Sequence, residues 1–195
     1  MNETIRVTGV CGSLRPESHT KMALAVALRG RVGVRGRHSP HRASELRAGV
    51  LRPGRRGRLS AGCPPASPRD GIILATPEYH GSLSGALKNM LDLMAADEFE
   101  RMFVALVGMA GGHTGTINSL NTMRAIGRNL HCWVLPQEVS VANSSSAFNE
   151  DGTVTDPTIE ERLLNIGRQV VKSASVQQKI RGEDFIKMWE GLPTW

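Results

Sequence analysis

Residues 71–92, GIILATPEYHGSLSGALKNMLD, carry the clearest structural signal in the chain. The stretch begins with a continuous apolar run, 71–76, which is typical of a strand buried on both faces. A turn-rich loop at 77–84 follows. After the loop, apolar side chains repeat at the spacing of an amphipathic helix: Leu87, Met90, Leu91 and Met94. A buried strand followed by such a helix predicts an α/β fold with a parallel sheet.

The same alternation continues on both sides of this stretch. Upstream, residues 5–10 predict a strand, and residues 18–28 predict a helix with Ser18 as its N-cap. Downstream we expect strands at 102–108 and 132–135, the second ended by Pro136, and helices at 117–130 and from Pro157, which follows the N-cap Asp156. The sequence therefore predicts one domain over 1–195, with helices on both faces of the sheet.

Residues 29–70 interrupt this pattern. The segment holds 12 of the 31 Gly and Pro residues and 11 of the arginines, without one lysine, and has neither helix nor strand periodicity. We expect it to be an irregular, exposed arm. Its net charge is +9, whereas the rest of the chain carries −3, so the basic character is local. We do not expect the domain to bind nucleic acid, although an arginine-rich arm that does so is an alternative.

The composition excludes several classes of protein. Hydrophobic residues make up 40% and charged residues 22%, and the mean hydropathy is −0.21, as in a globular protein. The longest apolar run, 102–109, is too short to span a membrane, and no signal-peptide pattern is visible. The three cysteines are widely spaced, and the six histidines show no ligand spacing. We therefore predict a reduced, cytoplasmic protein without a metal site.

Three loops of small and hydroxyl residues follow predicted strands, at 11–20, 77–82 and 108–115. The carboxyl ends of parallel strands share one edge of a sheet, where such folds bind ligands. The first loop offers hydroxyls and a guanidinium at a helix N-terminus, a set that suits a phosphate monoester: Ser13, Ser18, Thr20 and Arg15. It lacks the patterns GxxxxGK[ST] and GxGxxG, and an ordinary strand-to-helix turn with a serine cap is the alternative.

The other two loops suit a flat ligand. The second offers successive backbone amides beside an aromatic ring: Pro77, Glu78, Tyr79, His80 and Gly81. The third offers glycines that let the backbone approach a ligand: Gly111, Gly112 and Gly115. A surface turn and a flexible turn are the respective alternatives. Cys11 has no evident partner base, and Cys132 is expected to be a small buried hydrophobe, so neither is expected to be a nucleophile.

These loops together resemble one known family. GSLRPESHT at 12–20 and TPEYHGSLSGALKNMLD at 76–92 resemble the signature of the NADPH-dependent FMN reductase family, which has a flavodoxin-like fold. VGMAGGHTGTINSLNTMRAIGRNL at 107–130 resembles the third flavin loop and helix of that family. The resemblance covers 1–28 and 71 to about 192, and is greatest to the branch described as quinone or chromate reductases.

The resemblance implies a three-layer sandwich with a five-stranded parallel sheet and bound FMN. By position, Ser13, Arg15, Ser18 and Thr20 match the phosphate loop. The five residues 77–81 match the loop along the isoalloxazine edge, and the three glycines of the third loop match the pyrimidine side. Many relatives have Asn in place of His80. Residues 29–70 stand where the family has its second strand and helix, and their composition resembles translation in a wrong reading frame.

The function implied is that of an NAD(P)H-dependent flavin or quinone reductase. Hydride would pass from NADPH or NADH to flavin N5 and then to a quinone, free flavin or similar small molecule, with ping-pong kinetics. No side chain is expected to be catalytic. The resemblance also implies a homodimer or homotetramer that assembles through the helix after Ser82. A flavodoxin-like electron carrier that binds FMN without NAD(P)H turnover is the alternative.

Overall fold

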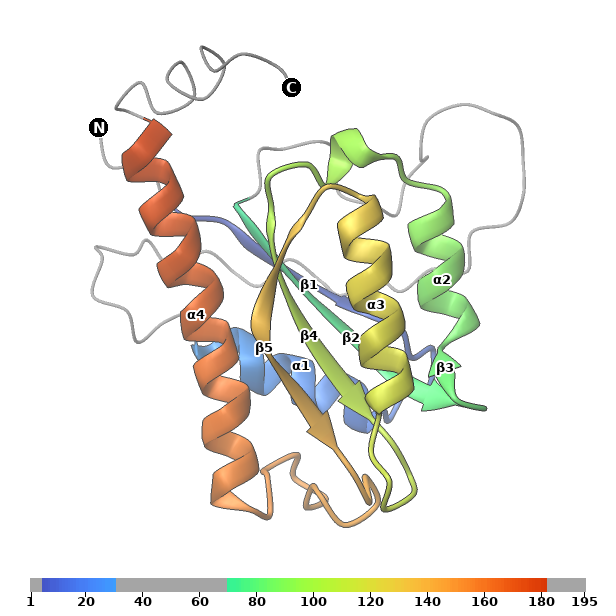
Figure 1. The fold of residues 1–195 in the computed structure, drawn as a ribbon. Coiled ribbons are helices and arrows are strands. Elements are labelled where there is room, and N and C mark those ends of the chain that lie inside the picture. The colour runs from blue at the N-terminus through green and yellow to red at the C-terminus, as the bar shows by residue number, and fades with distance from the viewer. Residues whose placement is uncertain (1–4, 31–69, 182–195) are drawn as a thin grey trace.

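The computed structural model of the chain describes residues 5–30 and 70–181 (Figure 1). The irregular arm predicted over 29–70 therefore lies outside the described residues, apart from its two ends. The family that the sequence resembles has its second strand and helix at this position, so that part of the prediction also lies outside the described residues. Statements about the sheet below refer to the described residues.

The described sheet has four parallel strands in the order β1-β2-β4-β5. Their bounds are Val7–Cys11 for β1, Gly71–Tyr79 for β2, Phe103–Met109 for β4 and Trp133–Val141 for β5. A fifth, two-residue strand, β3 (Ser82–Leu83), pairs with β2 in the antiparallel direction. The four strands predicted from the apolar pattern are present, and the order places the strands that precede the three predicted loops next to one another.

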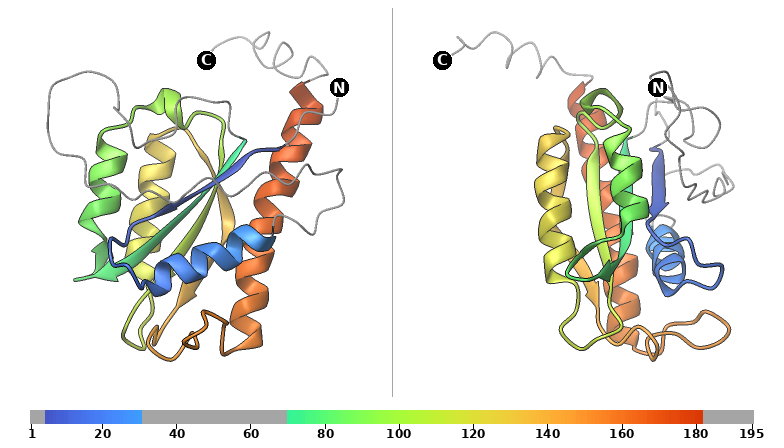
Figure 2. Two further views of the ribbon diagram at one scale, coloured as in Figure 1. Left: turned by 180° about the vertical axis from the view of Figure 1, so that it is seen from behind. Right: turned by 90° about the vertical axis from the view of Figure 1, so that its right-hand side faces the viewer.

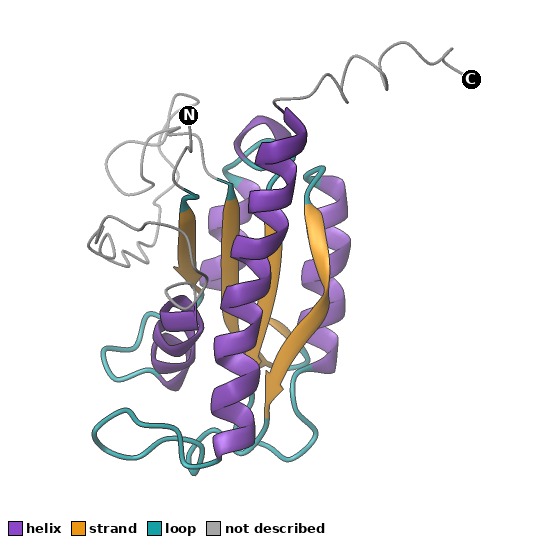
Figure 3. Ribbon diagram, turned by 90° about the vertical axis from the view of Figure 1, so that its left-hand side faces the viewer, coloured by secondary structure: helices purple, strands orange, loops and turns teal. Residues whose placement is uncertain are grey.

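Helices cover both faces of the sheet (Figures 2 and 3). Helices α1 (His19–Gly30) and α4 (Pro157–Arg181) pack on one face, and α2 (Gly85–Asp92) and α3 (Ile117–Asn129) on the other. A short 3-10 helix, η2, spans Ala96–Glu98. None of the described helices is long and apolar enough to cross a membrane.

The continuous apolar run of β2 explains the two layers of helices. Ile73 lies in the core beneath α1 and α4, whereas its neighbours Ile72 and Leu74 lie in the core beneath α2 and α3. Because successive side chains of a strand point to opposite faces, a strand buried on both sides must be apolar throughout. The α/β class, with helices on both faces of a parallel sheet, is therefore confirmed.

The predicted helix caps are present. The Ser18 hydroxyl accepts a hydrogen bond from the Lys21 amide at 3.4 Å at the start of α1. The Asp156 carboxylate accepts one from the Thr158 amide at 2.8 Å, with Pro157 as the first residue of α4. Proline fits this position because its missing N–H would have no partner within the helix.

The end of the last strand was predicted wrongly, because Pro136 does not end it. Strand β5 continues to Val141, and its pairing with β4 shifts register around Pro136. Proline is tolerated there because an irregular pairing needs no N–H from that residue. Arg124 of α3 compensates for the lost pairing, since its guanidinium donates to the carbonyls of Leu135 at 2.9 Å and Pro136 at 2.8 Å.

Candidate functional site

The three predicted loops lie together at the carboxyl edge of the sheet. Cys11 pairs with Ala75 and Ala75 with Val107, so β1, β2 and β4 end side by side. The chain leaving β1 continues this pairing for one residue, because the Gly12 amide donates to the Ala75 carbonyl at 2.7 Å. In Figure 1 this edge is at the bottom, where the arrowheads of β2, β4 and β5 lie.

The first loop gathers its polar groups at the N-terminus of α1. Ser13, Ser18 and Thr20 are only 3%, 5% and 3% exposed, whereas Arg15 is exposed. Arg15 forms no ion pair with any residue of the described ranges. An unpaired guanidinium beside the positive end of a helix favours an anionic ligand.

Cys11 is hydrogen-bonded to the first loop at Ser13. Its thiol donates to the Ser13 carbonyl at 3.8 Å, and the Ser13 amide donates to the sulfur at 3.4 Å. Burial raises the pKa of the Cys11 thiol, and the hydrogen bond to Ser13 offsets the rise only in part. Burial also raises the pKa of the half-buried Cys132 to about 11. Both free thiols therefore remain protonated at neutral pH, as the sequence indicated.

The second loop is a tight β-hairpin, so the turn-rich loop predicted over 77–84 is wrong at its start and end. Strand β2 extends to Tyr79, which pairs with Ser82 of β3. The two residues between them, His80 and Gly81, have φ values of 51° and 77°. Left-handed residues at both turn positions match the twist of a two-residue hairpin. His80 therefore occupies a backbone position that Asn and His tolerate better than most residues, and Tyr79 is 49% exposed.

Glu78 joins the second loop to the helix that follows the third. Its carboxylate accepts a hydrogen bond from the Ser119 amide at 2.9 Å, and Asn118 Nδ2 approaches it at 3.5 Å. The N-cap residue of α3, Thr116, makes no side-chain cap, because its hydroxyl and amide bond to Ser140 Oγ at 2.9 and 3.0 Å. Glu78 therefore caps α3 from another segment, a role that the local sequence did not indicate.

Ser84 joins the first loop to the second. Its hydroxyl donates to the Gly12 carbonyl at 2.6 Å and accepts from the Leu87 amide at 3.2 Å as the N-cap of α2. Its own amide donates to Thr76 Oγ1 at 3.0 Å. A Cβ added to Gly12 would lie 2.6 Å from Ser84 Oγ and 3.1 Å from Thr76 Oγ1, so only glycine fits. Sequence analysis missed Ser84 and Thr76, whose only signal is a serine directly before an amphipathic helix.

The third loop is open at two of its three glycines. No atom of residues 5–30 or 70–181, apart from the immediate chain neighbours, lies within 4 Å of a Cβ added at Gly111 or Gly112, and both residues are exposed. Gly115 differs, since its φ is 78° and an added Cβ would lie 2.7 Å from Ser140 Oγ. The backbone can therefore be approached closely at 111–112.

A fourth segment, residues 142–156, borders the third loop. The amide of Asn143 donates to the Gly112 carbonyl at 3.1 Å, and that of Ser144 donates to the Ala110 carbonyl at 2.9 Å. This segment connects β5 to α4, and sequence analysis assigned no role to it.

The edge therefore combines a helix N-terminus suited to an anion with a hairpin and an open glycine loop suited to a flat ligand. Within 5–30 and 70–181, no three His, Cys, Asp or Glu side chains are placed to share a metal ion. The residues predicted for the site all lie at this edge, although Thr20 belongs to the first turn of α1 and residues 77–79 to the end of β2. They remain predictions as ligand contacts.

Comparison with known families and proteins agrees with this geometry. Residues 67–146 match the family model of NADPH-dependent FMN reductases. An NADPH azoreductase from Bacillus sp. (strain OY1-2) is 40% identical over 114 residues, which is 55% of this chain and 64% of that protein. An FMN-dependent NADPH-azoreductase from Staphylococcus aureus (strain USA300) is 42% identical over 84 residues, which is 43% of this chain and 44% of that protein. The chain thus spans less than two thirds of either relative.

Solved structures share the fold over most of the chain. An NADH:FMN oxidoreductase in its apo form superposes with a TM-score of 0.68 and 20% identity over 87% of this chain and 90% of that one. A flavodoxin from the domain Archaea gives a TM-score of 0.59 and 8% identity, over 87% and 99% of the two chains. The resemblance to NADPH-dependent FMN reductases is confirmed over 67–146, which contains the second and third loops.

Proposed function

We propose that the protein is an NAD(P)H-dependent flavoenzyme that holds FMN at the carboxyl edge of its sheet and reduces a small molecule such as a quinone, free flavin or azo compound. The observation that carries this proposal is the convergence of the three loops at one edge, in a chain whose residues 67–146 match the FMN reductase family. The names of its relatives support both the nicotinamide donor and FMN.

The residues present fit FMN. The hydroxyls of Ser13, Ser18 and Thr20 and the amides at the start of α1 would hold the phosphate, with Arg15 supplying the positive charge. The hairpin 77–81 would lie along the isoalloxazine edge, and the open backbone at Gly111 and Gly112 would face the pyrimidine side.

Bound FMN would supply the hydride chemistry, accepting hydride from NAD(P)H and passing the electrons to the acceptor. The chain itself binds and orients the cofactor. Its N–H groups at the loop edge would stabilise negative charge that develops on the ring. Hydride transfer to and from the ring needs no protein nucleophile, and the two described thiols, whose pKa values are raised by burial, are not required to act as one.

The decisive experiment is an absorbance spectrum of the purified protein reconstituted with FMN, followed by steady-state oxidation of NADPH and of NADH with a quinone and with an azo dye. We expect flavin bands and parallel double-reciprocal lines, which indicate ping-pong kinetics. Flavin bands without NAD(P)H turnover would instead identify an electron carrier, and the absence of flavin binding would refute the proposal.

Arg15→Ala tests the phosphate loop. Because the guanidinium would meet only the phosphate, the variant should weaken FMN binding by about tenfold to a hundredfold, the effect of losing a charge-assisted hydrogen bond, and leave riboflavin binding nearly unchanged. Titration followed by flavin fluorescence measures both ligands. An equal loss for FMN and riboflavin would contradict the assignment.

We also propose that the protein is a cytoplasmic homodimer, or a pair of dimers, that assembles through α2. Leu93, directly after this helix, is 48% exposed, and Met90 and Met94 beside it are only partly buried, which leaves apolar surface available. Sedimentation at micromolar concentration should show at least a dimer. A monomer across that range would reject this part of the proposal.

A further inference from the structure

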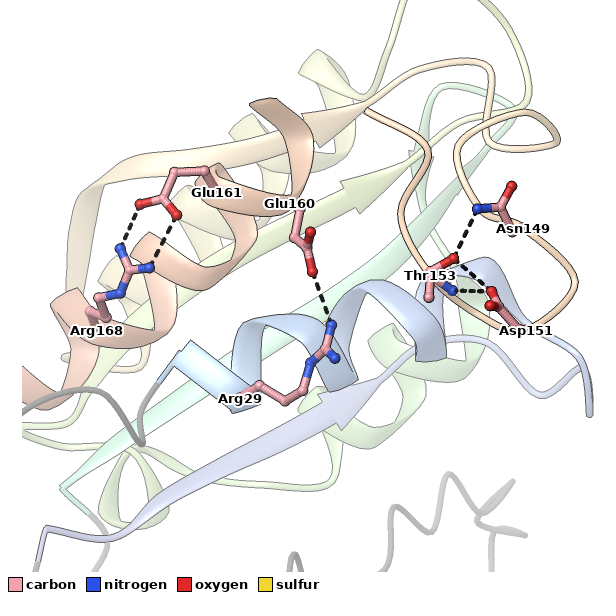
Figure 4. A network of polar contacts seen from close by, with 7 residues as sticks. All are labelled: Arg29, Asn149, Asp151, Thr153, Glu160, Glu161 and Arg168. Carbon is pink, nitrogen blue, oxygen red and sulfur yellow. Dashed lines mark hydrogen bonds and ion pairs between the residues drawn. The ribbon is translucent and has the colours of Figure 1, made fainter. Parts of the chain in front are cut away.

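The segment after β5 contains a small braced hairpin. Phe148 pairs with Val154 across it. At its tip, the Thr153 hydroxyl donates to Asp151 Oδ1 at 2.6 Å and accepts from Asn149 Nδ2 at 2.8 Å (Figure 4). These bonds hold the tip of the hairpin in one conformation. The hairpin is therefore a rigid support for the residues that its base contacts.

The base of this hairpin contacts the first turn of α1. The rings of Phe148 and His19 stack with their centroids 5.8 Å apart and their planes 11° from parallel. Phe148 is only 7% exposed and belongs to the core beneath α1 and α4. His19 is the first residue of α1 and stands between Ser18 and Thr20, two of the predicted phosphate contacts.

We infer that Phe148 and His19 are positioning residues for phosphate binding. The ring of Phe148 is anchored in the core, and the stack joins it to the first turn of α1, which carries amides and hydroxyls of the first loop. The stack therefore holds that turn in its binding geometry before the ligand arrives. Among the described ion pairs, the one that ties α1 to α4 is Arg29–Glu160, at the opposite end of α1 (Figure 4). The stack is therefore a contact placed to hold the N-terminal end, beside the core packing of Ala23 and Leu24.

Preorganisation of this kind acts on affinity. If the turn is mobile before binding, part of the binding free energy is spent on ordering it. If the turn is already ordered, that cost is absent and the ligand binds more tightly. The inference rests on the proposed FMN function, because it concerns how the same phosphate loop is held. It goes beyond that function in assigning roles to two residues that need not touch the ligand.

Variants of His19 separate positioning from direct contact. His19→Ala removes the stack and should weaken FMN binding about threefold to tenfold, in line with the value of an aromatic pair, while riboflavin binding changes less than twofold. His19→Phe keeps a flat ring for Phe148 and should restore FMN affinity. If His19→Phe binds FMN as weakly as His19→Ala, the imidazole acts directly on the ligand and the positioning role is overturned.

Phe148→Leu tests the other partner while keeping apolar volume in the core. It should reproduce the selective loss of FMN affinity, and its effect should not add to that of His19→Ala, because both variants remove the same contact. Phe103→Leu is the matched control, since Phe103 packs against the same core from β4. A similar FMN loss in the control, or full additivity of the first two variants, would overturn the inference.

Hydrogen exchange in the flavin-free protein gives a readout independent of FMN. The amides of Lys21 and Met22 bond to the side chain and carbonyl of Ser18. Both should exchange about threefold to tenfold faster in His19→Ala and at the wild-type rate in His19→Phe. If wild-type protein binds no FMN, the proposed function fails; if it binds FMN but exchange and affinity are unchanged in His19→Ala, only the inference fails.

Discussion

Glycines of the first and third loops occupy equivalent places after parallel strands, yet they are glycine for different reasons. A Cβ at Gly12 would lie 2.6 Å from Ser84 Oγ and 2.9 Å from Leu87 Cβ, whereas a Cβ at Gly111 or Gly112 would meet nothing within 4 Å. The first loop needs its glycine because the protein packs against it. Gly115 of the third loop also has an internal reason, since its φ is 78° and an added Cβ would lie 2.7 Å from Ser140 Oγ. Gly111 and Gly112 have no such reason, which leaves the backbone at 111–112 open to a ligand.

The bonds around the loops differ in kind: side chains join the first two loops, whereas the backbone amides of Asn143 and Ser144 bond to the third. The first and second loops are joined by Ser84, and the second is joined to α3 by Glu78. These contacts are made within the protein, so this side of the edge is built without a ligand. Substitutions can test the difference between the packed side, at Gly12, and the open side, at Gly111 and Gly112. We expect those on the packed side to lower stability and those on the open side to lower FMN affinity instead.

Gly12→Ala should have the largest effect on stability. Leu87 Cβ is held in place by the backbone of α2 and the Ser84 hydroxyl makes two hydrogen bonds, so neither can move away cheaply. We expect the free energy of unfolding to fall by about 3 kcal/mol, at the upper end of the usual cost of overpacking. Urea denaturation of the flavin-free protein measures it, with Gly111→Ala as the control. A change below about 0.5 kcal/mol would show that the loop is not packed as described.

Glu78→Ala should have a smaller effect. The variant removes the carboxylate that accepts from the Ser119 amide, and a lost cap typically costs about 1 kcal/mol. Glu78→Gln keeps an acceptor oxygen but not the charge, so it should lose about half as much. Thermal or urea unfolding compares the two variants. If Glu78→Ala were as stable as wild type, the second loop would not be held by α3.

The fold could be predicted from sequence wherever its cause is local. The apolar run at 71–76, the helical repeat after Ser84 and the Asp156–Pro157 cap each carry their own signal, and each is confirmed. Pro136 was misjudged because a local rule, that proline ends a strand, was overridden by a partner distant in sequence. Arg124 supplies the missing bonds from α3, and nothing near Pro136 indicates it.

The candidate site divides in the same way. The three loops could be located because strand ends are local features and parallel strands share an edge. The residues that join the loops could not be located from the sequence. Glu78 bonds to Ser119, which is 41 positions away, and Ser84 bonds to the Gly12 carbonyl, which is 72 positions away. The stack of Phe148 on His19 also pairs segments far apart in the sequence. Such contacts follow from topology and become visible only in the folded chain.

Gly112→Ala should have the smallest effect on stability, and one of opposite sign. The residue is not in the left-handed region and an added Cβ meets no atom, so alanine fits the folded chain. By restricting the unfolded chain, the substitution should raise the free energy of unfolding by about 0.4–1 kcal/mol. FMN binding should nevertheless weaken, because the methyl group would occupy space that the proposed function assigns to the flavin.

Gly85→Ala is the matched control for this last variant, since Gly85 also has nothing within 4 Å of an added Cβ but lies at the start of α2. It should stabilise the protein to a similar extent through helix propensity and leave FMN affinity as in wild type. Unfolding in urea and flavin titration are measured on both variants. A Gly112→Ala protein that binds FMN as tightly as Gly85→Ala would show that the open side of the edge is not where the ring approaches. The contrast between the first and third loops would then concern packing alone.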